Sequence, residues 1–579
     1  MQKNKTSSLK TRTNAFTACL VAAVLLCAAV LPCFAAPSGG DFCFTVATDT
    51  HVRPVSSFGD VSAIQNMPDE TLYHHATNQG LMYYESEAIL RSFLETFVAS
   101  DSAFLLLCGD FSTGAEKQNH RIVAGILAEY EEKGGKPIFV INGNHDVAAV
   151  STEKEMDIAD FKEIYRQFGY DEAIAVDAES GSYTADLYGD YRLLAIDSCK
   201  HGTGTGLITK GVQKFIKEQA KKAKEDGKHL IAMMHHPLLK HFGLEPTTKV
   251  TGSTIGIFAS QLASYGIKYV FNGHMHINDI AQKTTSGGLI TNVMTEALIT
   301  APNSFRTVSV TPDSFAVATD YVRAVDTQDL AAGYTEEQLS LIEDDYPAFA
   351  RGYFAASYHY WINRNLGDAG VVNGLLKLDP DSRLYGTLSD FMENIGRYVN
   401  LPLYANDTPE ADTIGELGKR IGIAIPESGY TYVHEFLDDV VWDFYCGTSD
   451  PDGKSTELSL LLPAAKTVLF YAVNDMIASG KRLQLKDLLD LLQDRGVLSP
   501  FTNTAALANA AADAITLALV SPLFAGIVGD YSAPDDVTYT GEGYASQTQT
   551  QPIARILAML KEFFERLFAL LKSPSLVIG

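Results

Sequence analysis

The chain has little cysteine and fewer basic than acidic residues. Three of its seven cysteines lie in the first 33 of 579 residues, and the other four are Cys43, Cys108, Cys199 and Cys446. Cysteines this sparse exclude a disulfide framework, and those inside apolar runs are predicted to be buried free thiols. Lys and Arg total 45 against 70 Asp and Glu, a formal net charge of −25. That balance argues against a stable nucleic-acid partner.

Long apolar runs are also scarce. Four cationic residues precede an apolar run from Ala15 to Leu31 and then small residues, which predicts a signal peptide over 1–35. An uncleaved membrane anchor is the alternative. Both a cleaved signal peptide and a retained anchor predict a secreted or cell-surface protein. A second run, 505–528, is interrupted by polar residues and a proline, which favours a buried helix pair over a membrane span.

Between residues 36 and 323, short apolar runs alternate with amphipathic segments, as in an α/β protein. Strands are predicted at 42–48, 103–108, 137–141, 191–197, 229–234 and 268–272. Helices are predicted near 85–100, 116–133, 157–168 and 209–226. Later segments, near 278–283, 288–294, 305–310 and 314–321, are predicted to be antiparallel strands that complete a second sheet.

The remainder is predicted to be mainly α-helical. A helical domain over 324–530 begins with a Thr335–Gln338 capping box, and further helices are expected near 385–398, 412–420, 456–480 and 484–494. Residues 531–551 are predicted to be a polar linker and 552–579 an amphipathic helix. That helix would dock on its own module or on a second copy, or bind an anionic membrane surface through residues 552–572.

Several apolar runs end in side chains that bind metals. The stretches are "FTVATDTH", "FLLLCGD", "VINGNHD", "LIAMMHHP" and "YVFNGHMH". In an α/β fold the carboxyl ends of the strands gather at one edge, so these side chains should meet. Carboxylates, imidazoles and one amide oxygen suit two divalent ions such as Mn, Fe or Zn. No serine or cysteine stands out as an activated nucleophile for acyl transfer.

The ordered set "DTH", "GD", "GNHD", "HHP" and "GHMH" resembles the calcineurin-like metallophosphoesterase superfamily over residues 42–322. The resemblance implies a four-layer α/β/β/α sandwich. It also implies one metal on Asp49, His51, Asp110 and His276, with Asp110 bridging to a second metal on Asn144, His235 and His274. His145 would protonate the leaving oxygen, and Asp146 would orient its ring. His235 is preferred to His236 because the family ligand stands two residues before the proline.

The function so implied is hydrolysis of a phosphomonoester or phosphodiester by attack of a hydroxide that bridges the metals, and the predicted signal peptide makes the enzyme an exported one. The substrate could be a nucleotide or other small phosphoester, a phospholipid-type diester or a cell-wall phosphate. A non-catalytic surface interaction protein built on a relic core is the alternative. Thr113 stands where the purple acid phosphatase branch has tyrosine, so a purple iron-tyrosinate centre is not expected.

Other polar residues have two interpretations each. Arg53 could meet a phosphate oxygen or be an ordinary surface arginine. The loop with His236 and His241 could face substrate or solvent. Residues 71–84 could form a rim or lid, or a loop packed on the domain. Three histidines that match no motif are predicted to be structural: His120, His201 and His229.

Overall fold

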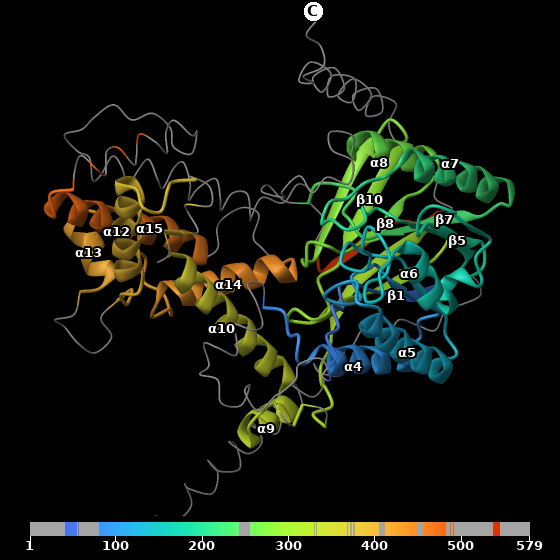
Figure 1. The fold of residues 1–579 in the computed structure, drawn as a ribbon, viewed down its shortest axis with the longest axis horizontal. Coiled ribbons are helices and arrows are strands. Elements are labelled where there is room, and N and C mark those ends of the chain that lie inside the picture. The colour runs from blue at the N-terminus through green and yellow to red at the C-terminus, as the bar shows by residue number, and fades with distance from the viewer. Residues whose placement is uncertain are drawn as a thin grey trace, which may run out of the picture.

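A computed structural model describes residues 41–54, 80–241, 255–404, 412–448, 456–481 and 536–544, apart from short gaps within these ranges (Figure 1). The predicted signal peptide, the apolar run 505–528 and the predicted C-terminal helix lie outside the described residues, as do positions 71–79 of the predicted rim.

One sheet has six strands in the order β13-β12-β11-β1-β2-β3. The strands are β1 (Phe42–Ala47), β2 (Leu105–Leu107), β3 (Ile138–Val140), β11 (Ser304–Val310), β12 (Ser314–Tyr321) and β13 (Thr538–Glu542). β1, β2 and β3 run parallel, so their carboxyl ends lie at one edge. β11, β12 and β13 extend the sheet in antiparallel pairing on the other side of β1.

The second sheet has seven strands in the order β4-β5-β6-β7-β8-β10-β9. They are β4 (Ala175–Val176), β5 (Tyr183–Asp186), β6 (Tyr191–Ile196), β7 (His229–Met234), β8 (Tyr269–Asn272), β9 (Asp279–Thr285) and β10 (Gly288–Met294). Its central strands β6, β7 and β8 are parallel. The near-continuous burial of β6 and β7 is typical of parallel strands covered on both faces.

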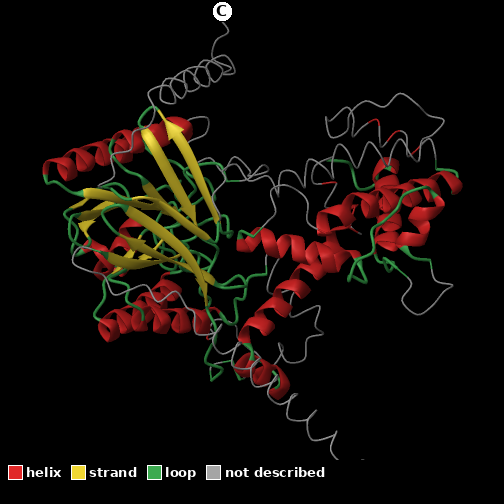
Figure 2. Ribbon diagram, turned by 180° about the vertical axis from the view of Figure 1, so that it is seen from behind, coloured by secondary structure: helices red, strands yellow, loops and turns green. Residues whose placement is uncertain are grey.

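Helices cover the outer faces of the two sheets, which makes four layers. α4 (Ser86–Ala99) and α5 (Lys117–Gly134) lie on one side, and α7 (Lys210–Glu225) and α8 (Ile255–Ser264) on the other (Figures 1 and 2). Between the sheets, Phe44 of β1 contacts Phe271 of β8, with ring centroids 5.5 Å apart. The predicted α/β/β/α sandwich is therefore confirmed.

The late strands do not share one sheet as the sequence suggested. β9 and β10 join the seven-stranded sheet, where β10 pairs in parallel with β8, whereas β11 and β12 join the six-stranded sheet beside β1. The prediction was wrong because local alternation identifies a strand but does not specify its partner.

A helical region follows, and its elements match most of the predicted segments. They are α9 (Glu336–Asp344), α10 (Tyr346–Leu366), α12 (Arg383–Val399), α13 (Ile414–Arg420), α14 (Val433–Cys446) and α15 (Thr456–Ala478). Thr335 and Gln338 form the predicted capping box. Among the described residues, Ser459–Ala478 has the length and composition of a membrane span, but half of it is buried within the protein, which is common for a soluble core helix.

The predicted polar linker contains a strand. β13 pairs with β12 from Ser314↔Glu542 to Ala318↔Thr538, so the chain returns to the edge of the six-stranded sheet (Figure 1). The alternating Thr-Tyr-Thr suits a half-exposed strand, and Tyr539 packs on the core between the sheets. Residues 538–542 are therefore not a linker.

Candidate metal centre

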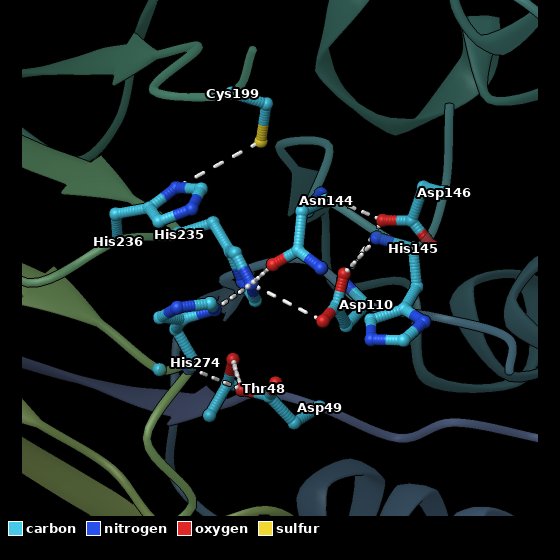
Figure 3. A network of polar contacts seen from close by, with 12 residues as sticks. Thr48, Asp49, Asp110, Asn144, His145, Asp146, Cys199, His235, His236 and His274 are labelled. Carbon is cyan, nitrogen blue, oxygen red and sulfur yellow. Dashed lines mark hydrogen bonds and ion pairs between the residues drawn. The ribbon is translucent and has the colours of Figure 1, made fainter. Parts of the chain in front are cut away.

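All seven predicted ligands lie at the carboxyl ends of five strands. Asp49 and His51 follow β1, Asp110 follows β2, Asn144 follows β3, His235 follows β7, and His274 and His276 follow β8. Figure 3 shows the cluster from close by, with Asp110 and Asn144 facing His235. The structure thus brings together, from both sheets, the residues that the sequence motifs singled out.

Two groups of three residues could each hold a cation. Asp49, His51 and His276 form one, and Asp110, His235 and His274 form the other; in each group the ligand atoms all lie within 4.8 Å of one another. Asn144 belongs with the second group, because its Oδ1 lies 3.0 Å from His235 Nε2.

Asp110 faces both groups. Its Oδ2 lies 3.2 Å from His235 Nε2 and 3.8 Å from His51 Nε2. Its Oδ1 accepts a hydrogen bond from the backbone N–H of His145 at 2.8 Å. One oxygen is therefore fixed by the backbone, and the other is directed at the space between the groups, as a bridging carboxylate requires.

The unpaired donor atoms fit divalent cations. Asp49 Oδ2 accepts from the Thr48 hydroxyl at 2.6 Å and from the His274 N–H at 2.9 Å, whereas Asp49 Oδ1 is buried without a hydrogen-bond partner. His51 Nε2 and His276 Nε2 face each other at 3.2 Å. A cation bound to these three atoms would satisfy lone pairs that protein donors leave unmet.

One ligand is oriented by the backbone. His235 Nδ1 lies 2.9 Å from the carbonyl oxygen of Cys108. An Nδ1–H that donates to this carbonyl leaves the Nε2 lone pair directed at Asp110 and the second group. Such an outer hydrogen bond fixes the tautomer of a metal-binding histidine.

The charges within the cluster are strongly coupled. Burial disfavours a charged His235, but Asp110 and Asp49 outweigh it and raise the pKa of His235 to about 10. Burial, together with the charge of His235, lowers the pKa of His274 to about 3. The carboxylates therefore attract positive charge into the cluster, and cations that bind there would displace protons.

The backbone at the cluster is strained. Five of the seven candidate ligands have positive φ: Asp49 at 50°, His51 at 35°, Asp110 at 55°, His274 at 76° and His276 at 60°. Non-glycine residues rarely adopt this region, and such residues gather at functional sites, where surrounding structure holds them. In the loops after β1 and β8, two pairs of these residues stand two positions apart in the sequence, Asp49 with His51 and His274 with His276, and all four lie in the cluster.

Two motif glycines allow the loops to approach. A Cβ on Gly143 would overlap the Asp110 carboxylate, and a Cβ on Gly273 would overlap the side chains of Thr48 and Asp49. Each glycine directly precedes a candidate ligand, Asn144 or His274. The missing side chain of Gly143 leaves room for Asp110, and that of Gly273 leaves room for Asp49.

His145 is exposed beside the cluster, and its ring centroid lies 5.1 Å from that of His51. Its Nδ1 faces the Thr113 carbonyl oxygen at 3.1 Å. The prediction that Asp146 orients this ring is wrong. Asp146 is buried and accepts from the backbone N–H groups of Asp110, Phe111 and Gly143 at 2.7–2.8 Å.

Asp146 therefore ties the loop after β2 to the loop after β3. Burial, with the adjacent charge of Asp110, raises the pKa of Asp146 to about 7. Three backbone donors on one carboxylate fix the position of Asp110, so Asp146 positions a candidate ligand rather than the imidazole. Sequence pattern does not reveal this role, since the partners are backbone atoms.

His236 lies beside the cluster but in neither group. Its Nδ1 lies 3.0 Å from the Ser198 hydroxyl, and its ring centroid lies 4.3 Å from that of His274. Figure 3 shows it between His274 and Cys199. Placing His235 rather than His236 at the cluster agrees with the proline register. His241 is buried against Asp279, not exposed to solvent.

The three unmatched histidines have structural contacts. His120 Nδ1 lies 2.8 Å from the Tyr165 hydroxyl, and His229 packs against Tyr544. His201 Nε2 lies 2.8 Å from Asp197, which also accepts from Asn142 at 3.0 Å. This buried network behind the loop after β3 was missed, because its members match no motif. The four cysteines among the described residues are free, as predicted, but Cys43 is half-buried rather than buried.

Comparison with known proteins identifies this region. The family model for calcineurin-like phosphoesterases matches residues 44–278, which include all seven candidate ligands. Residues 44–278 are therefore a calcineurin-like phosphoesterase domain. No curated protein matches the chain.

Solved structures with similarity include a dimetal phosphatase from Danio rerio, with 11% identity, 49% of this chain and 97% of that chain covered and a TM-score of 0.35. A purple acid phosphatase from yellow lupin seeds has 11% identity, coverage of 49% and 52%, and a TM-score of 0.32. A putative 5′-nucleotidase from Staphylococcus aureus has 14% identity, coverage of 52% and 58%, and a TM-score of 0.32. The match spans only about half the length of the last two chains.

Proposed function

We propose that this chain is a two-metal hydrolase of phosphomonoesters or phosphodiesters. The observation that carries the proposal is the placement of Asp110, one oxygen of which faces both groups of candidate ligands. Two divalent cations held there, Mn, Fe or Zn, would supply an activated water and neutralise the charge that builds on the phosphoryl group.

The roles proposed for the residues follow from their contacts. Asp49, His51 and His276 hold one cation, and Asn144, His235 and His274 hold the other, with Asp110 shared between them. His145 is the general acid, since its exposed ring adjoins the cluster without belonging to either group. The Thr113 carbonyl, not Asp146, orients it by accepting from Nδ1, which leaves Nε2 to protonate the leaving oxygen.

The alternative function is not enzymatic: the chain would be a surface interaction protein built on a relic phosphoesterase core. All seven ligand positions carry metal-binding side chains and converge, which favours an active hydrolase. Turnover by the purified protein decides between the two.

The proposals about cellular location and surface partners rest on the sequences of segments outside the described residues. Export is proposed from the charged and apolar pattern of residues 1–35. Membrane or self-association through 552–572 is proposed from the apolar stripe alone. Co-sedimentation with anionic vesicles at low salt, compared with a variant lacking 552–579, tests the membrane proposal, and loss of oligomeric mass in that variant indicates self-association.

The proposed reaction is tested with residues 36–579, loaded with Mn or Zn and assayed on 4-nitrophenyl phosphate and bis(4-nitrophenyl) phosphate. We expect metal-dependent release of nitrophenol from at least one substrate, and its abolition by chelator. The iron-loaded protein should lack the visible charge-transfer band of a tyrosinate centre, because Thr113 replaces the tyrosine. Absence of turnover with every metal would overturn the hydrolase proposal.

A further inference from the structure

A cleft of about 720 Å³ lies beside the proposed general acid. Thr113, whose carbonyl faces His145, lines the cleft, and so does Arg53, two residues after His51. An isolated bridge between Val52 and Ser112 joins the two loops that carry these residues. Thr113 and Arg53 therefore place one wall of the cleft next to His145 and to the loop that carries His51.

The cleft is positively charged on an acidic protein. Four cationic side chains line it, Arg53, Lys117, Arg121 and Lys154, against two carboxylates, Glu116 and Glu153, an excess of two positive charges on a chain of net −25. Lys117 already pairs with Asp160 at 3.0 Å. Arg53, Arg121 and Lys154 are exposed and come from three separate segments. A local excess of positive charge attracts anionic ligands.

Hydrogen bonds hold the wall of the cleft in place. The turn that carries Lys154 is closed by the Thr152 hydroxyl, which accepts from the Glu155 N–H at 2.9 Å. The Lys154 carbonyl accepts from the Lys117 N–H at 2.8 Å, at the first residue of α5. Lys117 Nζ donates to the Thr152 carbonyl at 2.9 Å.

α5 adds to the potential. The helix runs for 18 residues, has no acidic side chain in its first turn, and begins without a side-chain cap hydrogen bond. The first residues of α5 line the cleft, together with the carboxylate of its N-cap residue Glu116. The N-terminal end of the helix therefore borders the cleft, and such helix ends favour phosphate groups.

We propose that this cleft binds a second phosphate group on the leaving-group side of the substrate. The inference rests on the proposed function. The general acid protonates the oxygen that leaves, so the leaving group lies against His145, and a leaving group that extends past Thr113 reaches the cleft. The preferred substrates are then bisphosphorylated small molecules, from which hydrolysis releases inorganic phosphate and a leaving group that still carries phosphate.

The test compares 1,3-propanediol bisphosphate with propyl phosphate. The bisphosphate is symmetric, so cleavage of either end leaves a phosphorylated alcohol. We expect kcat/KM to be at least tenfold higher for the bisphosphate in the wild-type protein at low salt, and this preference to fall at high salt. Arg121→Glu and Lys154→Glu should each reduce the preference several-fold, while Arg121→Lys should retain most of it.

The matched control is Lys217→Glu, an equal charge change on the exposed face of α7, over the other sheet. It should keep the wild-type preference. A wild-type ratio near one, or a ratio that Arg121→Glu does not change, would overturn the assignment of the cleft while leaving the hydrolase proposal intact.

Binding gives a readout that does not need turnover. Calorimetric titration of 1,3-propanediol bisphosphate into the metal-free protein should show binding that Arg121→Glu weakens about tenfold and Lys217→Glu leaves unchanged. Should neither substrate be hydrolysed with any metal, the proposed function fails, and this titration alone decides the cleft. Equal affinity of Arg121→Glu and wild type for the bisphosphate would then overturn the assignment of the cleft as a phosphate site.

Discussion

Tyr544 lies more than 220 residues after the phosphoesterase domain in the sequence, yet Tyr544→Ala should destabilise that domain. The Tyr544 ring contacts His229 at 5.1 Å and Tyr191 at 5.6 Å between centroids, and its hydroxyl donates to the Leu230 carbonyl. Lys268 Nζ donates to the adjacent Gly543 carbonyl at 2.7 Å. Through these contacts and the pairing of β13 with β12, residues 538–544 pack against both sheets.

The magnitude follows from the burial. Removing a fully buried aromatic ring costs about 3–5 kcal/mol, and Tyr544 is only partly buried, so we expect Tyr544→Ala to lower the free energy of unfolding by about 2–3 kcal/mol. Tyr544→Phe keeps the ring but loses the hydroxyl, which donates to the Leu230 carbonyl and accepts from the Lys268 N–H at 3.3 Å, a loss of about 1–2 kcal/mol.

Urea unfolding followed by tyrosine fluorescence and circular dichroism measures both variants. The matched control is Tyr188→Ala, since that side chain is 46% exposed and its removal should cost less than Tyr544→Ala. If Tyr544→Ala unfolds at the same urea concentration as wild type, or costs no more than the control, the contacts of this segment do not stabilise the sheets.

Three further variants address the site and its surroundings. His145→Ala should leave metal content intact but slow hydrolysis of an alkyl phosphate by roughly 10²- to 10⁴-fold, as for loss of a general acid; unchanged turnover would remove that role. Asp110→Ala should lower the content of both metals, whereas His236→Ala should spare them, and equal loss by mass spectrometry in the two variants would mean that the wrong residues were chosen as ligands. Burial raises the pKa of Glu85 to about 7, because the buried site favours the protonated side chain. The stability that this preference contributes is fully present below the unfolded pKa of about 4.3 and is lost as pH rises through 7. Glu85→Gln should flatten the fall in stability over that window, by up to about 3 kcal/mol, and a variant whose profile parallels wild type would refute the shift.

The sequence predicted the cluster of candidate ligands because each stands shortly after a buried strand. Asp49 and Asp110 follow apolar runs that local pattern identifies, and parallel strands place their ends together whatever the remainder of the fold. The helical region was likewise predicted from capping and amphipathic spacing, as at Thr335. These features depend on interactions within a few residues.

The features that were mispredicted depend on distant partners. β13 forms because β12 presents an open edge more than 200 residues earlier, and a short polar strand carries no mark of that pairing. The family resemblance implied that Asp146 orients His145, although its partners are backbone N–H groups of its own loop and of the loop after β2. β9 and β11 have similar local patterns, but they entered different sheets.

The claim that two cations act together at this centre is tested most directly by titrating metal-free protein with Mn while measuring the initial rate of phosphoester hydrolysis and the bound metal per chain. We predict two bound ions per chain and a rate that remains low through the first equivalent and rises with the second. A single bound ion at full activity, or hydrolysis that does not depend on added metal, would contradict the proposed mechanism.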